Sequence, residues 1–152
     1  MIDRRMISAL VLSAAGLVGI LTHESYREKA YNDGAGVTTV GFGSTKGVKP
    51  GDRISVEEAL RRASSDTEKV GQSIKQCIKV PLSQNEYDAY VSLAYNIGPT
   101  AFCNSTLVKK LNQLQYAQAC AQISRWTKAG GKELRGLVKR RASERALCES
   151  SN

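Results

Sequence analysis

Hydrophobic and polar residues follow each other along the chain in blocks that predict helices for most of its length. Residues 7–22 contain no charged side chain. From Val56 onward, apolar residues recur at intervals of three and four, which is the spacing of one helix face. Ser55 and Glu58 have the spacing of a capping box at the start of this run, and Pro81 follows its end. The pattern predicts a long helix that begins after Ser55 and ends before Pro81.

The second half of the chain predicts four further helices. Ser83 and Glu86 repeat the capping-box spacing, and the apolar residues that follow extend a helix to Gly98. The polar, glycine-containing segment 127–133 is typical of a loop. The other helices are expected at 106–114, 116–126 and 134–147, the last of them dense in Lys and Arg.

A polar, glycine-rich stretch separates the uncharged segment from the long helix. Residues 31–36 read Tyr-Asn-Asp-Gly-Ala-Gly, which is the composition of a turn. Residues 37–42 read Val-Thr-Thr-Val-Gly-Phe, a β-branched run typical of a strand or hairpin arm. The expected fold is therefore α+β and mostly α, with a small β element near the N-terminus and a helical lobe behind the long helix.

Charge and length narrow the classes of protein. The chain has 152 residues, which indicates one domain, and 41% of them are hydrophobic, enough for a buried core. Lys and Arg number 22 against 14 Asp and Glu, a formal net charge of +8. This surplus indicates an anionic partner, and a bacterial envelope or nucleic acid would fit. The chain lacks an RNA-binding aromatic signature, zinc-finger spacing and a basic-leucine pattern, so nucleic acid is not expected.

The four cysteines, Cys77, Cys103, Cys120 and Cys148, all lie in the second half of the chain. No two have C-x-x-C spacing and the single histidine, His23, is distant, so a zinc site is not expected. An even number in a small basic protein indicates two disulfides in an oxidising compartment. Four buried thiols are the alternative. Four cysteines allow three pairings, between which the sequence does not choose.

Residues 7–22 have three interpretations. Arg4 and Arg5 followed by an apolar run are typical of a secretory signal, and residues 13–16 supply a small-residue cleavage site. A run of 16 residues is shorter than the roughly 20 that span a bilayer comfortably, so an ordinary core helix is the second interpretation. The third, which we favour, is an uncleaved weak anchor whose small residues let it leave the lipid. The positive-inside rule then exports everything after Thr22, which fits the disulfides.

Glu24, Asp33 and Thr39 are the candidate catalytic residues. A short path from helix to turn to strand can bring all three to one cleft. Cleavage of a glycosidic bond needs a carboxylic acid that gives its proton to the leaving oxygen, and a second carboxylate that holds water or stabilises positive charge. Glu24 follows apolar residues and is the candidate acid, whereas Asp33 lies in a wetter turn. Spacing alone is weak evidence, because isolated Glu and Asp residues usually lie on the surface.

Residues 24–43, ESYREKAYNDGAGVTTVGFG, resemble the active-site stretch of the T-even-type phage lysozymes, glycoside hydrolase family 24. The family motif is Glu, eight residues, Asp, five residues and Thr, which Glu24, Asp33 and Thr39 match without a gap. The resemblance implies a muramidase that hydrolyses the β-1,4 bond between N-acetylmuramic acid and N-acetylglucosamine. It also implies a lysozyme-like fold, with a small β-hairpin lobe and a larger helical lobe joined by a long helix. The similarity extends through residues 80–102, 105–112 and 125–147.

The resemblance also implies roles for single residues. Glu24 would be the acid, and Asp33 and Thr39 would flank the sugar. Tyr95 and Asn96 match positions that line the family's cleft, although helix-end packing is an alternative. The family needs no metal and no organic cofactor. One of Arg140, Arg141 and Arg145 is a candidate partner for Glu24, while most of this cluster is expected to form a solvated basic face. Ser44 stands where many relatives have His, which suggests a missing stabilising contact.

The chain is similar, within this family, to the signal-anchor-release endolysins. This implies that residues 1–22 are an anchor that becomes the first helix after release, and that residues 23–152 are the muramidase domain. The expected location is the periplasmic face of the host inner membrane, then the periplasm, with peptidoglycan as partner and a monomeric state. While Leu21 and Thr22 lie at the lipid boundary, Glu24 is not expected to reach the other catalytic residues. The implied disulfides are Cys77–Cys103 and Cys120–Cys148.

Three other functions remain open from the sequence. The first is a wall-binding module without catalysis, and the second is a membrane-active protein that acts through its basic last helix. The third is a cytoplasmic endolysin that a holin releases, with residues 7–20 as an ordinary helix.

Overall fold

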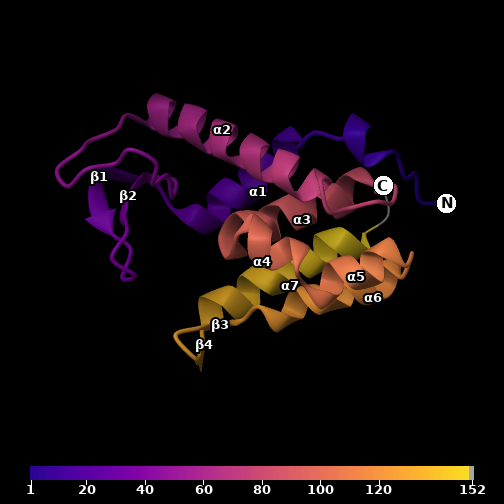
Figure 1. Ribbon diagram of the computed structural model, residues 1–152. Helices are drawn as coiled ribbons and strands as arrows, with labels where there is room; N and C mark the ends of the chain where they lie inside the picture. Colours follow the sequence, from indigo (N-terminus) through magenta and orange to yellow (C-terminus); the bar gives the residue numbers. More distant parts are fainter. Residues whose placement is uncertain (151–152) are drawn as a thin grey trace.

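Two helices organise the structure, a long one that leaves a small hairpin lobe and a buried one at the centre of the helical lobe (Figure 1). The computed structural model describes residues 1–150. Its elements follow the order η1 (Ile7–Ala9), α1 (Ala14–Glu24), β1 (Arg27–Asn32), β2 (Thr38–Gly41), α2 (Val56–Lys75), α3 (Gln84–Ile97), α4 (Pro99–Cys103), α5 (Thr106–Asn112), α6 (Tyr116–Gln122), η2 (Ile123–Arg125), β3 (Lys128–Ala129), β4 (Lys132–Glu133) and α7 (Arg135–Glu149).

The small lobe is the antiparallel hairpin of β1 and β2, in which Tyr31 lies opposite Thr39. A minor core of Val40, Ile54 and Ala59 ties this hairpin to the first turn of α2. Gly41 has a φ of +66°, and a Cβ there would lie 3.0 Å from the Cβ of Ala59. A glycine at this position therefore lets the hairpin approach α2 closely.

The larger lobe surrounds α3, which is buried at nine consecutive positions from Glu86 to Ala94. Helices α1, α2, α4 and α7 all pack against it. The expected capping box is present: the Ser83 hydroxyl accepts from the N–H of Glu86, and the Glu86 carboxylate accepts from the N–H of Ser83. Ser55 caps α2 with the hydroxyl half of this motif, by accepting from the N–H of Glu58, whose carboxylate pairs with Arg62. The predicted arrangement, mostly helical with a small β lobe, is confirmed.

Helix α2 ends at Lys75, earlier than the expected limit at Pro81. The Asn112 side chain explains the difference, because it bonds to the backbone after the helix. Its Oδ1 accepts from the N–H of Lys79 at 2.8 Å, and its Nδ2 donates to the carbonyl of Cys77 at 2.9 Å. The chain thereby exchanges helical hydrogen bonds for contacts with α5.

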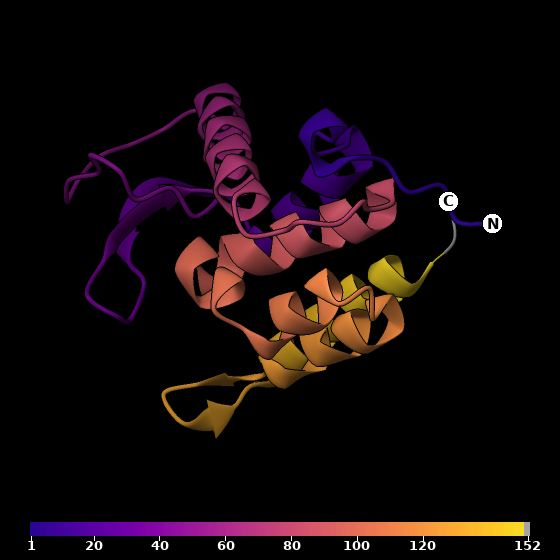
Figure 2. The same ribbon diagram turned by 45° about the vertical axis from the view of Figure 1, so that its right-hand side comes forward.

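The expected loop at 127–133 is a short hairpin of β3 and β4, which projects from the helical lobe (Figure 2). Gly130 and Gly131 have φ values of +57° and +78°. Two positive φ values in succession build the tight turn that favours a two-residue hairpin. The Gly-Gly pair was the available sequence signal. Strand β1 and helix α4 were also absent from the prediction.

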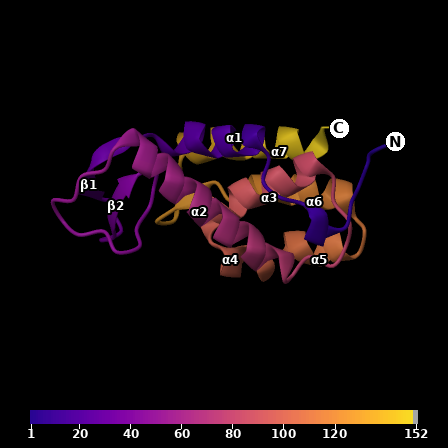
Figure 3. The same ribbon diagram turned by 90° about the horizontal axis from the view of Figure 1, so that it is seen from above.

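The uncharged N-terminal segment forms a helix only from Ala14, so the expected first helix is shorter at its start and reaches Glu24. Between the 3-10 turn η1 and α1, side chains of α2 and of the start of α3 bind the backbone carbonyls. The Nζ of Lys75 donates to the carbonyl of Leu10 at 2.5 Å, and Gln84 donates to the carbonyl of Val11 at 2.8 Å. Seen from above, α1 runs toward the hairpin lobe and α2 away from it, and the two helices diverge with distance from that lobe (Figure 3). Within residues 1–150, no helix has both the length and the apolar composition of a membrane span.

Two disulfides close the helical lobe. Cys77, just after α2, is joined to Cys103 at the end of α4. Cys120 on α6 is joined to Cys148 on α7. This is the pairing that the family resemblance implied.

Candidate active site

A cleft of about 420 Å³ lies where the end of α1, the β1–β2 hairpin, α2 and α3 meet. It brings together all three candidate catalytic residues and both candidate substrate-binding residues. The lining residues are Glu24, Tyr31, Asp33, Thr39, Gly43, Thr45, Lys46, Asp66, Val70, Tyr95 and Asn96.

Glu24 is the last residue of α1, and its side chain is 19% exposed. The Nη1 of Arg140 donates to its Oε1 at 2.5 Å. Its Oε2 faces the hairpin, because a Cβ placed on Gly43 would lie 3.3 Å from that oxygen. Arg140 is thus the arginine of α7 that pairs with Glu24, as the resemblance implied for one of the three. A buried guanidinium holds one oxygen, and the other lies beside a residue without a side chain.

Arg140 belongs to a chain of alternating charges that crosses the helical lobe. Its Nε donates to Oε1 of Glu144 at 3.1 Å, and Arg141 donates to Oε2 of the same carboxylate at 2.6 Å. Ser92 on α3 donates to Glu144 at 2.7 Å. With Glu24, the two arginines and two carboxylates cancel in charge, as buried ions require. This network determines where the guanidinium of Arg140 meets Glu24.

The expected solvated basic face on α7 is wrong for two of its three arginines. Arg140 and Arg141 are 6% and 1% exposed. Arg141 also donates to Oδ1 of Asn96 and to the carbonyl of Trp126, so it ties the end of α3 to the segment before β3. Arg145 does lie at the surface, where it pairs with Glu149.

Asp33 and Thr39 lie on opposite sides of the hairpin turn. Oδ1 of Asp33 accepts from the N–H groups of Ala35 at 2.8 Å and Val37 at 3.1 Å, so the turn orients the carboxylate. Asp33 is exposed, as its place in a wetter turn predicted. Thr39 is only 4% exposed, and its hydroxyl donates to the carbonyl of Val37 at 3.2 Å.

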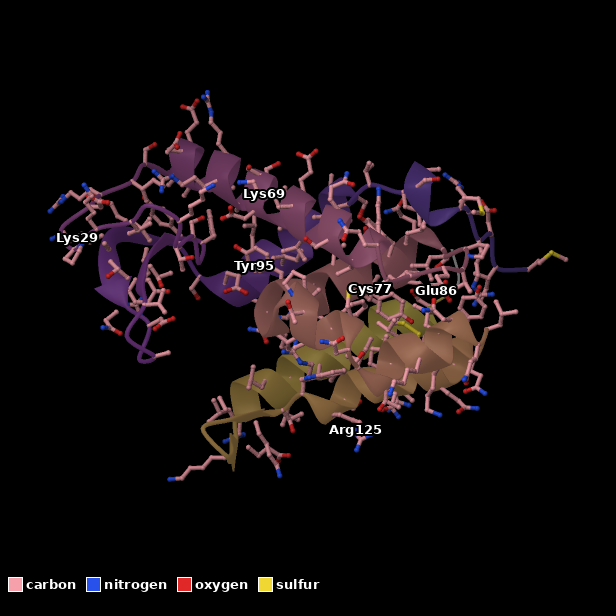
Figure 4. The ribbon with its side chains drawn as sticks, in the orientation of Figure 1. Lys29, Lys69, Cys77, Glu86, Tyr95 and Arg125 are labelled. Carbon is pink, nitrogen blue, oxygen red and sulfur yellow. A yellow bond between two sulfur atoms is a disulfide. The ribbon has the colours of Figure 1, made fainter. Side chains whose placement is uncertain are left out.

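Tyr95 connects the two lobes across the cleft. Its hydroxyl donates to the carbonyl of Phe42 at 3.1 Å. Burial and the nearby charge of Glu24 raise the pKa of Tyr95 well above its usual value, so the hydroxyl keeps its proton. Figure 4 shows Tyr95 at the end of α3 that is nearer the hairpin lobe, with Glu86 at the opposite end.

Ser44, which stands where many relatives have His, is bound to the long helix. Its hydroxyl donates to Oδ2 of Asp66 on α2 at 2.8 Å, and Ser44 is 4% exposed. Asp66, Thr45, Lys46 and Val70 were not predicted as cleft residues. No spacing rule distinguishes them from surface residues of a helix or loop. Within residues 1–150, no three His, Cys, Asp or Glu side chains are grouped as metal ligands.

Several known proteins are similar to this chain. The family model for phage lysozyme matches residues 21–144. The endolysin of Acyrthosiphon pisum secondary endosymbiont phage 1 is 46% identical over 144 residues, which cover 92% of this chain and 99% of that protein. The SAR-endolysin of Bacteriophage PS34 is 37% identical over 93% of this chain and 83% of that protein. The solved muramidase domain of SpmX from Asticaccaulis excentricus has a TM-score of 0.86 at 30% identity, covering 92% and 98%.

Proposed function

The chain belongs to the phage lysozyme family, and on that basis we propose that it is a glycoside hydrolase of family 24. Its reaction is hydrolysis of the β-1,4 bond between N-acetylmuramic acid and N-acetylglucosamine in peptidoglycan, which lyses the host cell. The observation that carries this proposal is the meeting of Glu24, Asp33 and Thr39 in one cleft. A wall-binding module of this fold would not need the three together.

Glu24 is the general acid of the proposed reaction. Arg140 occupies Oε1, so Oε2, which lies toward Gly43, is the oxygen that gives its proton to the leaving group. Asp33 is held by its turn and stabilises the positive charge that develops on the sugar, or orients the attacking water. Thr39 helps to place that water from the opposite strand. Tyr95 and Asn96 form the α3 wall against which the sugar binds.

The direct test is Glu24→Gln, which keeps the shape of the side chain and removes the acid. The substrate is purified peptidoglycan, and the measurement is the release of new reducing ends at muramic acid. Turnover is expected to fall by at least about 100-fold, the contribution of a positioned general acid. Glu149→Gln is the matched control, because Glu149 lies on α7 in a surface pair with Arg145. Full release of reducing ends by Glu24→Gln would assign the general acid to another residue. Retained lysis of cells without new reducing ends would support action through the basic last helix instead.

We also propose that residues 1–22 are an uncleaved anchor, which places the chain at the periplasmic face of the host inner membrane before release. The similarity to SAR-endolysins supports this proposal. So does the exposure of apolar side chains in the segment, since Met6, Val11 and Val18 are 63%, 70% and 62% exposed. Solvent-exposed apolar residues gain nothing from this fold, but they would favour a lipid environment.

Fractionation of host cells that express the full chain tests the anchor. Before the membrane potential is dissipated, the chain is expected in the membrane fraction without wall-cleaving activity. Afterwards it is expected in the periplasm with activity. A chain that stays in the cytoplasm under both conditions would support release by a holin.

A further inference from the structure

Asp88 is a buried carboxylate at the start of α3, and it contacts the N-terminus of α1. It is 3% exposed. Its Oδ1 accepts from the backbone N–H of Ser13 at 3.1 Å and from Nε2 of Gln84 at 2.9 Å. The Ser13 hydroxyl donates to Oδ2. Both oxygens are therefore occupied, and Ser13 supplies two of the three donors.

The N-terminal end of α1, and not a cation, stabilises the carboxylate of Asp88. Among residues 1–150, no Lys, Arg or His forms an ion pair with it. Ser13 is the N-cap of α1, and its hydroxyl also accepts from the N–H of Gly16 at 2.9 Å. The free N–H groups of a helix start carry partial positive charge, which stabilises a nearby carboxylate. Ser13 thus joins α1 and Asp88 into one hydrogen-bonded unit.

Gly16 permits this close approach. A Cβ at Gly16 would lie 2.7 Å from Cγ of Asp88, which is shorter than any real Cβ contact. Glycine inside a helix is destabilising relative to alanine. Its use here is explained by the packing of the first turn of α1 directly on the Asp88 carboxylate.

The rest of α1 is held loosely. Gly16 and Ile20 are its only buried residues within the described chain. A cavity of about 330 Å³ lies beside the start of the helix, lined by Ala14 and Leu17 of α1, by residues 11–13 before it, by residues of α2 and by Tyr87 of α3. Polar contacts therefore locate the two ends of α1. One end is held by Asp88 through Ser13, and the other by Arg140 through Glu24.

We propose that Asp88 is a positioning residue for the reaction, which sets the location of Glu24 through α1. The inference rests on the proposed role of Glu24 as general acid. The helix has 11 residues, so about 16 Å of rigid backbone separates its two held ends. A shift at the Ser13 end is transmitted along this rod, because the cavity beside α1 offers little resistance. Asp88 itself touches no cleft residue that contacts the sugar.

Asp88→Ala and Ser13→Ala test the proposal in the purified full chain with its disulfides formed. Asp88→Ala is expected to lower kcat by about 10- to 100-fold, the usual effect of displacing a catalytic group by about 1 Å. KM should stay near its wild-type value, since the sugar-binding walls do not change. Ser13→Ala should lower kcat in the same way, and the double variant should be no worse than Asp88→Ala, because the two residues act as one contact. If Asp88→Ala does not fold, Asp88→Asn replaces it, and kcat is measured well below its unfolding temperature.

Ser105→Ala is the matched control. Ser105 is the N-cap of α5; its hydroxyl accepts from Val108 at 3.3 Å and donates to the carbonyl of Phe102 at 2.6 Å. It resembles Ser13 in chemistry but lies away from the cleft, so its loss should lower stability with kcat unchanged. Gly16→Ala gives a second readout. It should lower kcat strongly when Asp88 is present and weakly in the Asp88→Ala background.

The outcomes separate the two proposals. A folded Asp88→Ala or Asp88→Asn enzyme with wild-type kcat would overturn the positioning role, provided that Glu24→Gln is inactive. An equal loss of kcat in Ser105→Ala would overturn it as well, because the effect would then follow general stability. A Glu24→Gln enzyme that still released reducing ends from peptidoglycan would overturn the role of Glu24 as general acid, on which this inference rests.

Discussion

Arg4 and Glu86 form the ion pair that fastens the start of the chain to α3, and its removal should be measurable. Nε of Arg4 donates to Oε1 and Oε2 of Glu86 at 3.2 and 3.0 Å, and Nη2 donates to Oε1 at 2.7 Å. The Glu86 side chain is 3% exposed and that of Arg4 is 26% exposed. These hydrogen bonds also raise the pKa of the Arg4 guanidinium. Arg4→Ala would leave a buried carboxylate without its cation.

The expected loss follows from these contacts. Removing one partner of a buried ion pair costs about 3–5 kcal/mol. The lower end applies, because water can reach the exposed side of Arg4 and Glu86 keeps its bond from the N–H of Ser83 at 2.8 Å. Arg4 also lies 3.6 Å from the ring centre of Tyr116, a cation–π contact of about 0.5–1 kcal/mol. Arg4→Ala should therefore destabilise the fold by about 3.5–4 kcal/mol, or lower Tm by about 7–16 °C.

Urea and thermal unfolding at neutral pH, followed by circular dichroism with both disulfides intact, measure this loss. Arg5→Ala is the neighbouring control: Arg5 pairs with Asp3 at the surface, where both side chains are about two-thirds exposed, at 65% and 66%. It should cost at most about 1 kcal/mol. Glu86→Gln in the Arg4→Ala background should restore part of the stability, because an amide carries no unpaired charge. Equal effects of Arg4→Ala and Arg5→Ala would refute the reasoning.

Three further predictions concern Gly43 in the cleft, the disulfide of Cys77 and the titration of His23. Gly43→Ala, at a φ of +94° and 3.3 Å from Oε2 of Glu24, should lower both stability, by about 1–2 kcal/mol, and kcat. Gly47→Ala, at +71° in open space, should lower stability alone, and unchanged kcat in Gly43→Ala would contradict the contact. Loss of the disulfide of Cys77, whose partner is 26 residues away, should cost about 3.5 kcal/mol in urea unfolding, and a loss below 1 kcal/mol would exclude this loop-closure effect. Burial and the charge of Arg140 lower the pKa of His23 below its usual 6.5. Since the unfolded state then binds a proton at His23 more readily than the folded state, the free energy of unfolding should fall as pH decreases below about 6.5. His23→Asn should remove this part of the pH dependence of urea unfolding, and an unchanged slope would show that other groups cause it.

Local sequence signals predicted the elements whose stability depends on their own residues. The capping box of Ser83 and Glu86 and the three-to-four spacing after Ser55 both predicted helices, because these interactions join residues within one turn. The spacing of Glu24, Asp33 and Thr39 predicted a common cleft, because a helix, a turn and a strand of this length return the chain on itself. The family resemblance supplied the chemistry and the disulfide pairing, which spacing alone left open.

Sequence patterns did not predict the features that depend on contacts between distant residues. The end of α2 depends on Asn112, which lies 33 residues beyond Lys79 along the chain. The burial of Arg141, which looked like a surface residue of a basic helix, depends on partners on α3 and beside β3. In both cases the deciding energy is a hydrogen bond to a residue that the local pattern does not contain.

The sequence by itself thus determined most of the helices and the turn and second strand of the small hairpin, because capping, periodicity and turn composition act over a few residues. With the family resemblance, it also determined the three candidate catalytic residues. Only the tertiary structure decided which arginine pairs with Glu24, since Arg140 is 116 residues away and its neighbours on α7 carry the same charge. It also decided that Asp88 binds the N-cap of α1 and that Glu86 pairs with Arg4. A buried charge is stable only beside a complementary partner, and packing between distant segments determines which partner that is.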